Sequence, residues 1–148
     1  MICMFLGHKD TPDSVKPYLK EAILKLITER GIKQFYVGNN GNFDFYAQRM
    51  LKEIAQTHTE VEYGIVLSYI HECAIGGEQE ATLYPEGLES TPLRFCISKR
   101  NEWLLKRSDF LIAYVAHKFS NSYKWLERAR KRGLHIINLA QTMEKVLF

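Results

Sequence analysis

The feature that most constrains the fold of this chain is the segment from residue 35 to residue 44. An apolar run, Phe35 to Val37, stops at Gly38, and a pattern with the period of a helix begins near Asn42. A strand that ends in glycines and leads directly into a helix presents free backbone N–H groups and the positive end of a helix dipole. The segment therefore predicts an α/β fold with a loop suited to phosphate or another anion, but it indicates no reaction.

Strand and helix patterns alternate along the rest of the chain. Five short apolar runs, typical of parallel strands buried on both faces, lie at residues 2–6, 34–37, 61–70, 110–116 and 135–139. Helical patterns separate them, at residues 15–31, from about 42 to 54, at 96–107 and 121–132, with a short helix after residue 139. Ser14 is expected to cap the first helix and Gly31 to end it. The alternation predicts a Rossmann-like three-layer sandwich, in which a five-stranded parallel sheet in the order 3-2-1-4-5 carries helices on both faces.

Composition limits the class of protein. With 148 residues, 46% of them hydrophobic and 25% charged, the chain is expected to form one domain over residues 1–148. The formal net charge of +3 is spread along the chain, and the basic stretch 124–132 is typical of a solvated helix face, so nucleic acid is not the expected partner. No apolar run approaches the roughly 20 residues of a membrane span. We expect a cytoplasmic protein without a membrane partner.

Cysteine and histidine usage predicts no metal site. Cys3, Cys73 and Cys96 are odd in number and lack a CxxC spacing, which argues against both a disulfide framework and a zinc ribbon. His71, Glu72 and Cys73 are adjacent and cannot all face one ion on an extended segment. The surrounding residues 71–95 follow no sustained period, and an irregular segment of this length is often a functional lid.

A sheet in this order has its switch point between the first and fourth strands, and ligands bind outside the carboxyl ends of the strands there. Three segments are expected to meet at that crevice, namely residues 7–9, 38–44 and 117–124. Gly7 and His8 belong to the first of them, and His8 is expected either to contact a ligand or to serve in capping and packing.

The order and spacing of several motifs resemble a known group. Gly7-His8-Lys9, Gly38-x-x-Gly41-x-x-Asp44, Arg100-Asn101 and Ser108-Asp109 are similar to those of the small bacterial YpsA-like members of the SLOG superfamily. That superfamily includes the DNA-processing protein DprA and the Lonely Guy phosphoribohydrolases. The resemblance implies a Rossmann-like nucleotide-binding domain whose ligand is a nucleotide or an NAD or ADP-ribose derivative.

One loop departs from this pattern. Lonely Guy enzymes carry Gly-Gly-x-Gly-Thr-x-x-Glu after the fourth strand, and residues 120–127 here keep the glutamate, Glu127, but not the glycines. A phosphate cradle needs glycine for close backbone approach, so this loop is not expected to bind phosphate in the family's way. Asn121 and Ser122 can still cap the helix that follows and present its N-terminus. Glu127 is the one candidate catalytic residue.

The remaining candidates each have two readings. Gly38 and Gly41 are either plain turn glycines or parts of a phosphate loop, to which Asn39 and Asn40 would add polar reach. Asp44 suits the first turn of any helix, and near a ligand it would accept from a ribose hydroxyl or tie the loop down.

Asn101 lies on the inward stripe of its helix, where a buried amide must find partners in a loop or a ligand. Arg100, about 100° away around the helix, is expected at the rim of the crevice, where it would bind phosphate or a surface acid.

The leading hypothesis is a nucleotide-binding or nucleotide-derivative-binding protein that acts as a sensor or regulator. The alternatives are an N-glycosidic hydrolase of nucleotides, with Glu127 assisting at the ribose, and a DprA-like binder of single-stranded nucleic acid. The ligand set contains no certain cofactor, and homo-oligomerisation is left open.

Overall fold

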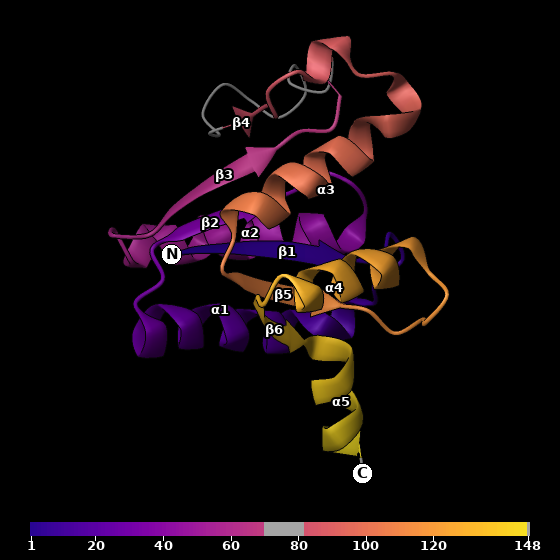
Figure 1. Cartoon of the computed structure of the whole chain (residues 1–148). Helices are drawn as coiled ribbons and strands as arrows, with labels where there is room; N and C mark the ends of the chain where they lie inside the picture. Colours follow the sequence, from indigo (N-terminus) through magenta and orange to yellow (C-terminus); the bar gives the residue numbers. More distant parts are fainter. Residues whose placement is uncertain (70–81, 148) are drawn as a thin grey trace.

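The computed structural model describes residues 1–69 and 82–147 and contains a six-stranded parallel sheet in the order β4-β3-β2-β1-β5-β6 (Figure 1). The strands are β1 (Ile2–Gly7), β2 (Gln34–Val37), β3 (Glu62–Val66), β4 (Thr82–Leu83), β5 (Phe110–Tyr114) and β6 (His135–Asn138). The helices are α1 (Lys16–Arg30), α2 (Asn42–Thr57), α3 (Cys96–Arg107), α4 (Asn121–Lys131) and α5 (Leu139–Leu147). The Rossmann-like α/β layout is therefore confirmed.

The expected number of strands is wrong. A sixth strand, β4, pairs in parallel with the end of β3, through Ile65 with Thr82 and Val66 with Leu83. This edge strand has only two residues, too few to give a strand pattern in the sequence. The five expected strands lie next to one another as β3-β2-β1-β5-β6, and the sheet order differs from the expected one by the added edge.

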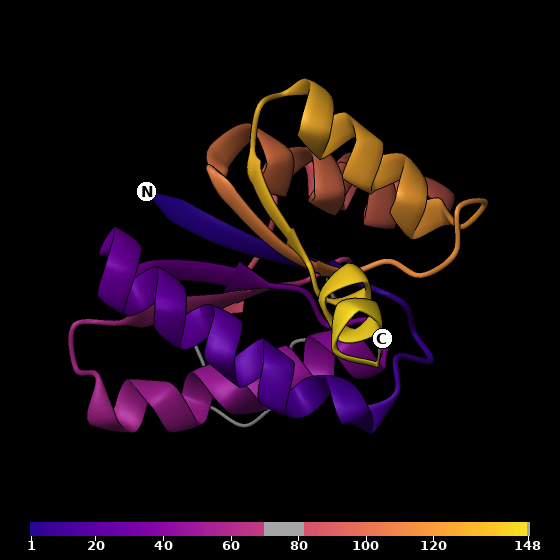
Figure 2. The same ribbon diagram turned by 90° about the horizontal axis from the view of Figure 1, so that it is seen from below.

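Helices cover both faces of the sheet, as Figure 2 shows: α1, α2 and α5 lie on one side, and α3 and α4 on the other. Each side has its own cluster of buried apolar residues. The first includes Leu19 of α1, Phe43 of α2 and Leu139 of α5, and the second includes Leu104 of α3 and Leu126 of α4. Burial on both faces explains why the central strands are continuously apolar rather than alternating.

The helix ends agree only in part with the expected signals. Gly31 ends α1 in the left-handed conformation, with φ of 67°, as predicted. Ser14 does not cap α1, because it lies inside a 3-10 turn, Asp13–Val15, and α1 begins at Lys16. Ser120, rather than Asn121 or Ser122, caps α4: its Oγ accepts from the N–H of Tyr123 at 3.1 Å.

The segment predicted as a lid falls partly outside the described residues, as do His71, Glu72 and Cys73. Its described part, 82–95, is more regular than expected. It contains β4 and two 3-10 turns, Leu88–Ser90 and Leu93–Phe95, the second of which leads directly into α3. Among the described helices, none combines the length and the apolar character that a membrane crossing requires.

Candidate functional site

A cavity of about 380 Å³ lies at the carboxyl end of β1, where the loop before α2, the inner side of α3 and the start of α4 also meet. Eight of the predicted ligand-binding residues line it: Gly7, His8, Asn40, Asp44, Arg100, Asn101, Asn121 and Ser122. They come from four separate parts of the chain: the end of β1, the loop before α2 with the first turn of α2, α3, and the start of α4. This is the switch point of the sheet, where ligands of such folds bind.

Four predicted residues lie elsewhere. Gly38, Asn39 and Gly41 do not line this cavity. Glu127 lies beyond it on α4, in a separate surface hollow between α3 and α4, where it forms an ion pair with Arg130. The structure thus separates the candidate catalytic carboxylate from the other site residues.

The floor of the cavity is a buried polar network built around Asp44. The carboxylate of Asp44 accepts a hydrogen bond from the N–H of Asn40, at 2.9 Å from Oδ2. Arg100 Nη1 donates to Ser68 Oγ at 2.9 Å. With its amide oxygen directed at them, Asn40 accepts from Ser68 Oγ at 2.7 Å and from Arg100 Nη1 at 2.6 Å. The network ties the loop before α2 to the end of β3 and to α3.

Arg100 is not at the rim, as expected, but is buried with only 6% of its surface exposed. Its long side chain reaches inward from α3 and packs beside Asp44 above Gly38. A Cβ atom added to Gly38 would lie 2.7 Å from Asp44 Oδ2 and 2.8 Å from Arg100 Nη1. Burial raises the pKa of Asp44, and the charge of Arg100 acts in the opposite direction.

Close packing against neighbouring protein atoms also explains why residue 41 is a glycine. Its φ of 93° is a conformation that favours glycine, and an added Cβ would lie 2.5 Å from Lys9 Cα. The next residue, Asn42, donates its N–H to the carbonyl of Lys9 at 2.9 Å. The first N–H of α2 is therefore already paired with protein. Gly38 and Gly41 allow loops to meet, and their phosphate-binding role stays a prediction.

The first two residues of α4, unlike those of α2, line the cavity. Ser120, Asn121 and Ser122 all line the cavity, and Ser122 Oγ donates to the carbonyl of Gly7 at 3.2 Å, which holds α4 against the end of β1. The first N–H groups of a helix, here those of Asn121 and Ser122, have no partner within the helix. Asn121 is exposed, so this helix start faces an accessible part of the cavity.

Asn101 is buried on the inward stripe of α3, as predicted, with 4% of its surface exposed. Its Oδ1 accepts from Arg100 Nη2 at 3.2 Å. No hydrogen bond joins its amide nitrogen to another residue that the structure describes, and Asn101 lines the cavity. The amide nitrogen can therefore donate to an acceptor on a ligand.

Sequence reasoning missed several residues of this site. Ser68 lies two residues beyond β3 and joins the buried network, while Asp10 and Ile97 line the cavity. A polar residue close to the end of a buried strand was the available signal for Ser68. The other two contribute through loop and helix positions that no local pattern marks.

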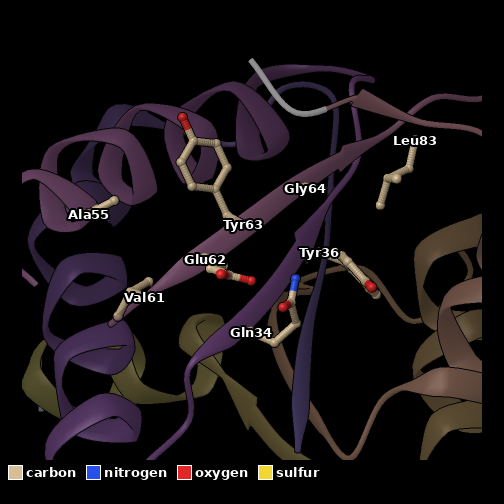
Figure 3. A pocket seen from close by; sticks show the side chains of 8 residues that line it. All are labelled: Gln34, Tyr36, Ala55, Val61, Glu62, Tyr63, Gly64 and Leu83. Atoms are coloured by element: carbon tan, nitrogen blue, oxygen red, sulfur yellow. The ribbon is translucent and has the colours of Figure 1, made fainter. Parts of the chain in front are cut away.

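A larger hollow, of about 480 Å³, lies on the outer part of the sheet over β2 and β3 (Figure 3). Gln34 is level with Glu62 and Tyr36 with Gly64 in the register of these strands, and Leu83 lies at the other end. Glu62 is the only charged residue among those that line it, and none of the predicted site residues is present. Gln34, Tyr36 and Glu62 are among its lining residues, but polar side chains are fewer here than in the smaller cavity.

Comparisons with protein-family models and with curated proteins found no match to this chain. Within residues 1–69 and 82–147, no group of three or more His, Cys, Asp and Glu side chains could hold a metal ion. The chemistry of the site is therefore inferred from its own residues.

Proposed function

We propose that this protein binds a nucleotide or a nucleotide derivative of the NAD or ADP-ribose type and acts as a sensor or regulator. The observation that carries the proposal is the meeting of eight predicted residues in one cavity at the switch point of the sheet. A cavity of about 380 Å³ is within the usual size of a small-molecule site. The cavity residues offer hydrogen-bond donors and acceptors from several elements, as a polar, multifunctional ligand requires.

Within this proposal, the phosphate of the ligand lies at the start of α4 rather than at the start of α2. Helix α2 has its first N–H paired with Lys9 and places the carboxylate of Asp44 near its first turn. A carboxylate there would repel a phosphate. The start of α4 has no acid in its first turn and faces the cavity through Asn121 and Ser122.

Asp44 then serves to hold the loop before α2 in place. Its Oδ2 accepts from Asn40, and its charge is balanced by the buried guanidinium of Arg100. Of the two roles open to Asp44 in the sequence, tying the loop down has the support of these contacts.

The hydrolase alternative has less support. An N-glycosidic hydrolase would need a carboxylate at the ribose, and Glu127 lies outside the cavity in an ion pair with Arg130. Asp44, the acidic side chain buried beside Arg100, is engaged in the network of the floor. We therefore favour binding without turnover.

The test is a matched pair of amide-to-carboxylate variants. Asn121→Asp places a negative charge in the first turn of α4, which favours the helix but repels a bound phosphate. Gln141→Glu makes the same change in the first turn of α5, at an exposed position outside this cavity. Thermal shift and calorimetric titration with AMP, ADP-ribose and NAD measure the outcome.

We expect at least one of these ligands to stabilise the wild-type protein, by about 2.7 kcal/mol at 100 times its Kd. Asn121→Asp should weaken its binding at least tenfold without lowering the melting temperature of the free protein, and Gln141→Glu should leave binding unchanged. If no nucleotide in a broad panel binds at millimolar concentration, the proposal is refuted.

A further inference from the structure

The side chain of His8 is held in one tautomer by the backbone. His8 follows β1, and its Nε2 lies 3.0 Å from the backbone nitrogen of Ala116, just beyond β5. A backbone N–H can only donate, so Nε2 must carry the lone pair. In a neutral imidazole the proton is then on Nδ1, which becomes a donor.

The surroundings favour this neutral form. Only 8% of His8 is exposed, and the ring centroid of His117 lies 4.8 Å away, with that of Tyr114 at 6.0 Å. Burial lowers the pKa of His8 first, the neighbouring His117 lowers it further, and Asp10 acts in the opposite direction. Lys9, the next residue along the chain, also faces the cavity.

The Nδ1 donor has no acceptor among the described residues, and His8 lines the cavity. It is close in space to the start of α4, because Ser122 bonds the carbonyl of the preceding residue, Gly7, at 3.2 Å. His8 and the first turn of α4 thus border the same part of the cavity. Both offer donors, and an oxygen-rich group between them would satisfy both.

We propose that His8 is a specificity-determining residue, which donates its Nδ1–H to a phosphate oxygen of the ligand while Ala116 fixes its tautomer. This proposal rests on the proposed function and adds to it the side chain that recognises the phosphate by a hydrogen bond. It assigns the two ring nitrogens separate tasks: Nε2 positions the ring, and Nδ1 recognises the ligand.

Two substitutions separate these tasks. The carboxamide of glutamine reaches the position of Nε2, so His8→Gln can still accept from Ala116 but loses the donor at Nδ1. The carboxamide of asparagine matches Nδ1, so His8→Asn keeps a donor toward the cavity but cannot reach Ala116. His135→Gln, an exposed histidine of β6 that does not line the cavity, is the control.

The probes are AMP, adenosine and inorganic phosphate, measured by calorimetry beside the melting temperature of each free variant. We expect AMP to bind at least tenfold more tightly than adenosine. His8→Gln should melt near the wild type but lose at least tenfold in AMP affinity, whereas His8→Asn should melt lower and keep affinity within about threefold. His135→Gln should change AMP affinity less than twofold.

Nitrogen-15 NMR of the free protein at pH 7.5 checks the tautomer without any ligand and should show the proton of His8 on Nδ1. A proton on Nε2, full AMP affinity in His8→Gln, or equal binding of adenosine and AMP would each overturn the inference. If the wild-type protein binds neither AMP nor phosphate, the phosphate site itself fails. Binding of AMP that is indifferent to His8→Gln refutes the role of His8 alone.

Discussion

Replacing Arg100 by methionine tests whether the floor of the cavity is held together by buried charge. Methionine is close to arginine in length and apolar volume but removes the guanidinium. The carboxylate of Asp44, a buried residue at the cavity, would then lose the cation that opposes the effect of burial on its pKa. Ser68 Oγ and Asn101 Oδ1 would each lose a donor in the same step.

The expected cost follows from the burial of the remaining partner. Removing the cation that acts on a buried carboxylate is expected to cost about 3–5 kcal/mol, the range for breaking a buried ion pair, because the carboxylate charge is left uncompensated. The lost hydrogen bonds belong to the same network and are not added separately. With a urea m value of about 2 kcal/mol/M, the unfolding midpoint should fall by about 1.5–2.5 M.

The effect should depend on pH with a definite sign. Burial raises the folded-state pKa of Asp44, so its protonation favours folding below the unfolded pKa, and this contribution is lost as pH rises through the folded value. Without Arg100 the folded-state pKa rises further. The stability difference between wild type and Arg100→Met should therefore be smallest in acid and grow as pH rises through the raised pKa.

Urea unfolding between pH 5 and pH 8, followed by circular dichroism, measures both effects. Arg49→Met is the matched control, since Arg49 is exposed on α2, and its change should stay within about 0.5 kcal/mol. Adding Asp44→Asn to Arg100→Met removes the orphaned charge and should recover part of the loss. A loss below about 1 kcal/mol, or one that does not vary with pH, would refute the reasoning.

Three further predictions concern the same region. Gly7→Ala should destabilise the fold by about 1–3 kcal/mol in chemical unfolding, because its Cβ would lie 2.3 Å from Phe43 Cγ, whereas a change below about 0.5 kcal/mol would contradict that packing. Ser120→Ala should cost about 1 kcal/mol through loss of the cap on Tyr123 N–H, and equal unfolding midpoints would rule out the cap. Because the pKa of His8 is lowered in the folded protein, neutral His8 contributes stability above the usual histidine pKa, and this contribution is lost as pH falls through the folded-state pKa. Between pH 7.5 and pH 5 the melting temperature should therefore fall less in His8→Gln than in the wild type. Equal falls in the two proteins would contradict this prediction.

The sequence by itself determined the layers of this protein. The boundaries of α3 and β2 agree with the expected ones, because apolar periodicity and glycine signals are properties of short segments. The approximate place of the candidate site also followed from the sequence, since parallel strands bring their carboxyl ends to one edge. Eight predicted residues meet there.

Only the tertiary structure decided where each of these side chains points and which partners it has. β4 exists because Thr82 and Leu83 find the exposed edge of β3, and a two-residue strand has no pattern of its own. Arg100 was expected at the rim because helical geometry gives the direction of Cβ, but its long side chain turns inward to Asp44 and Ser68, which are distant in sequence. The tertiary structure also decides which helix start keeps its first N–H group available. At α2 the N–H of Asn42 already donates to the carbonyl of Lys9, a residue distant in the sequence, so the start of α4 is the available one.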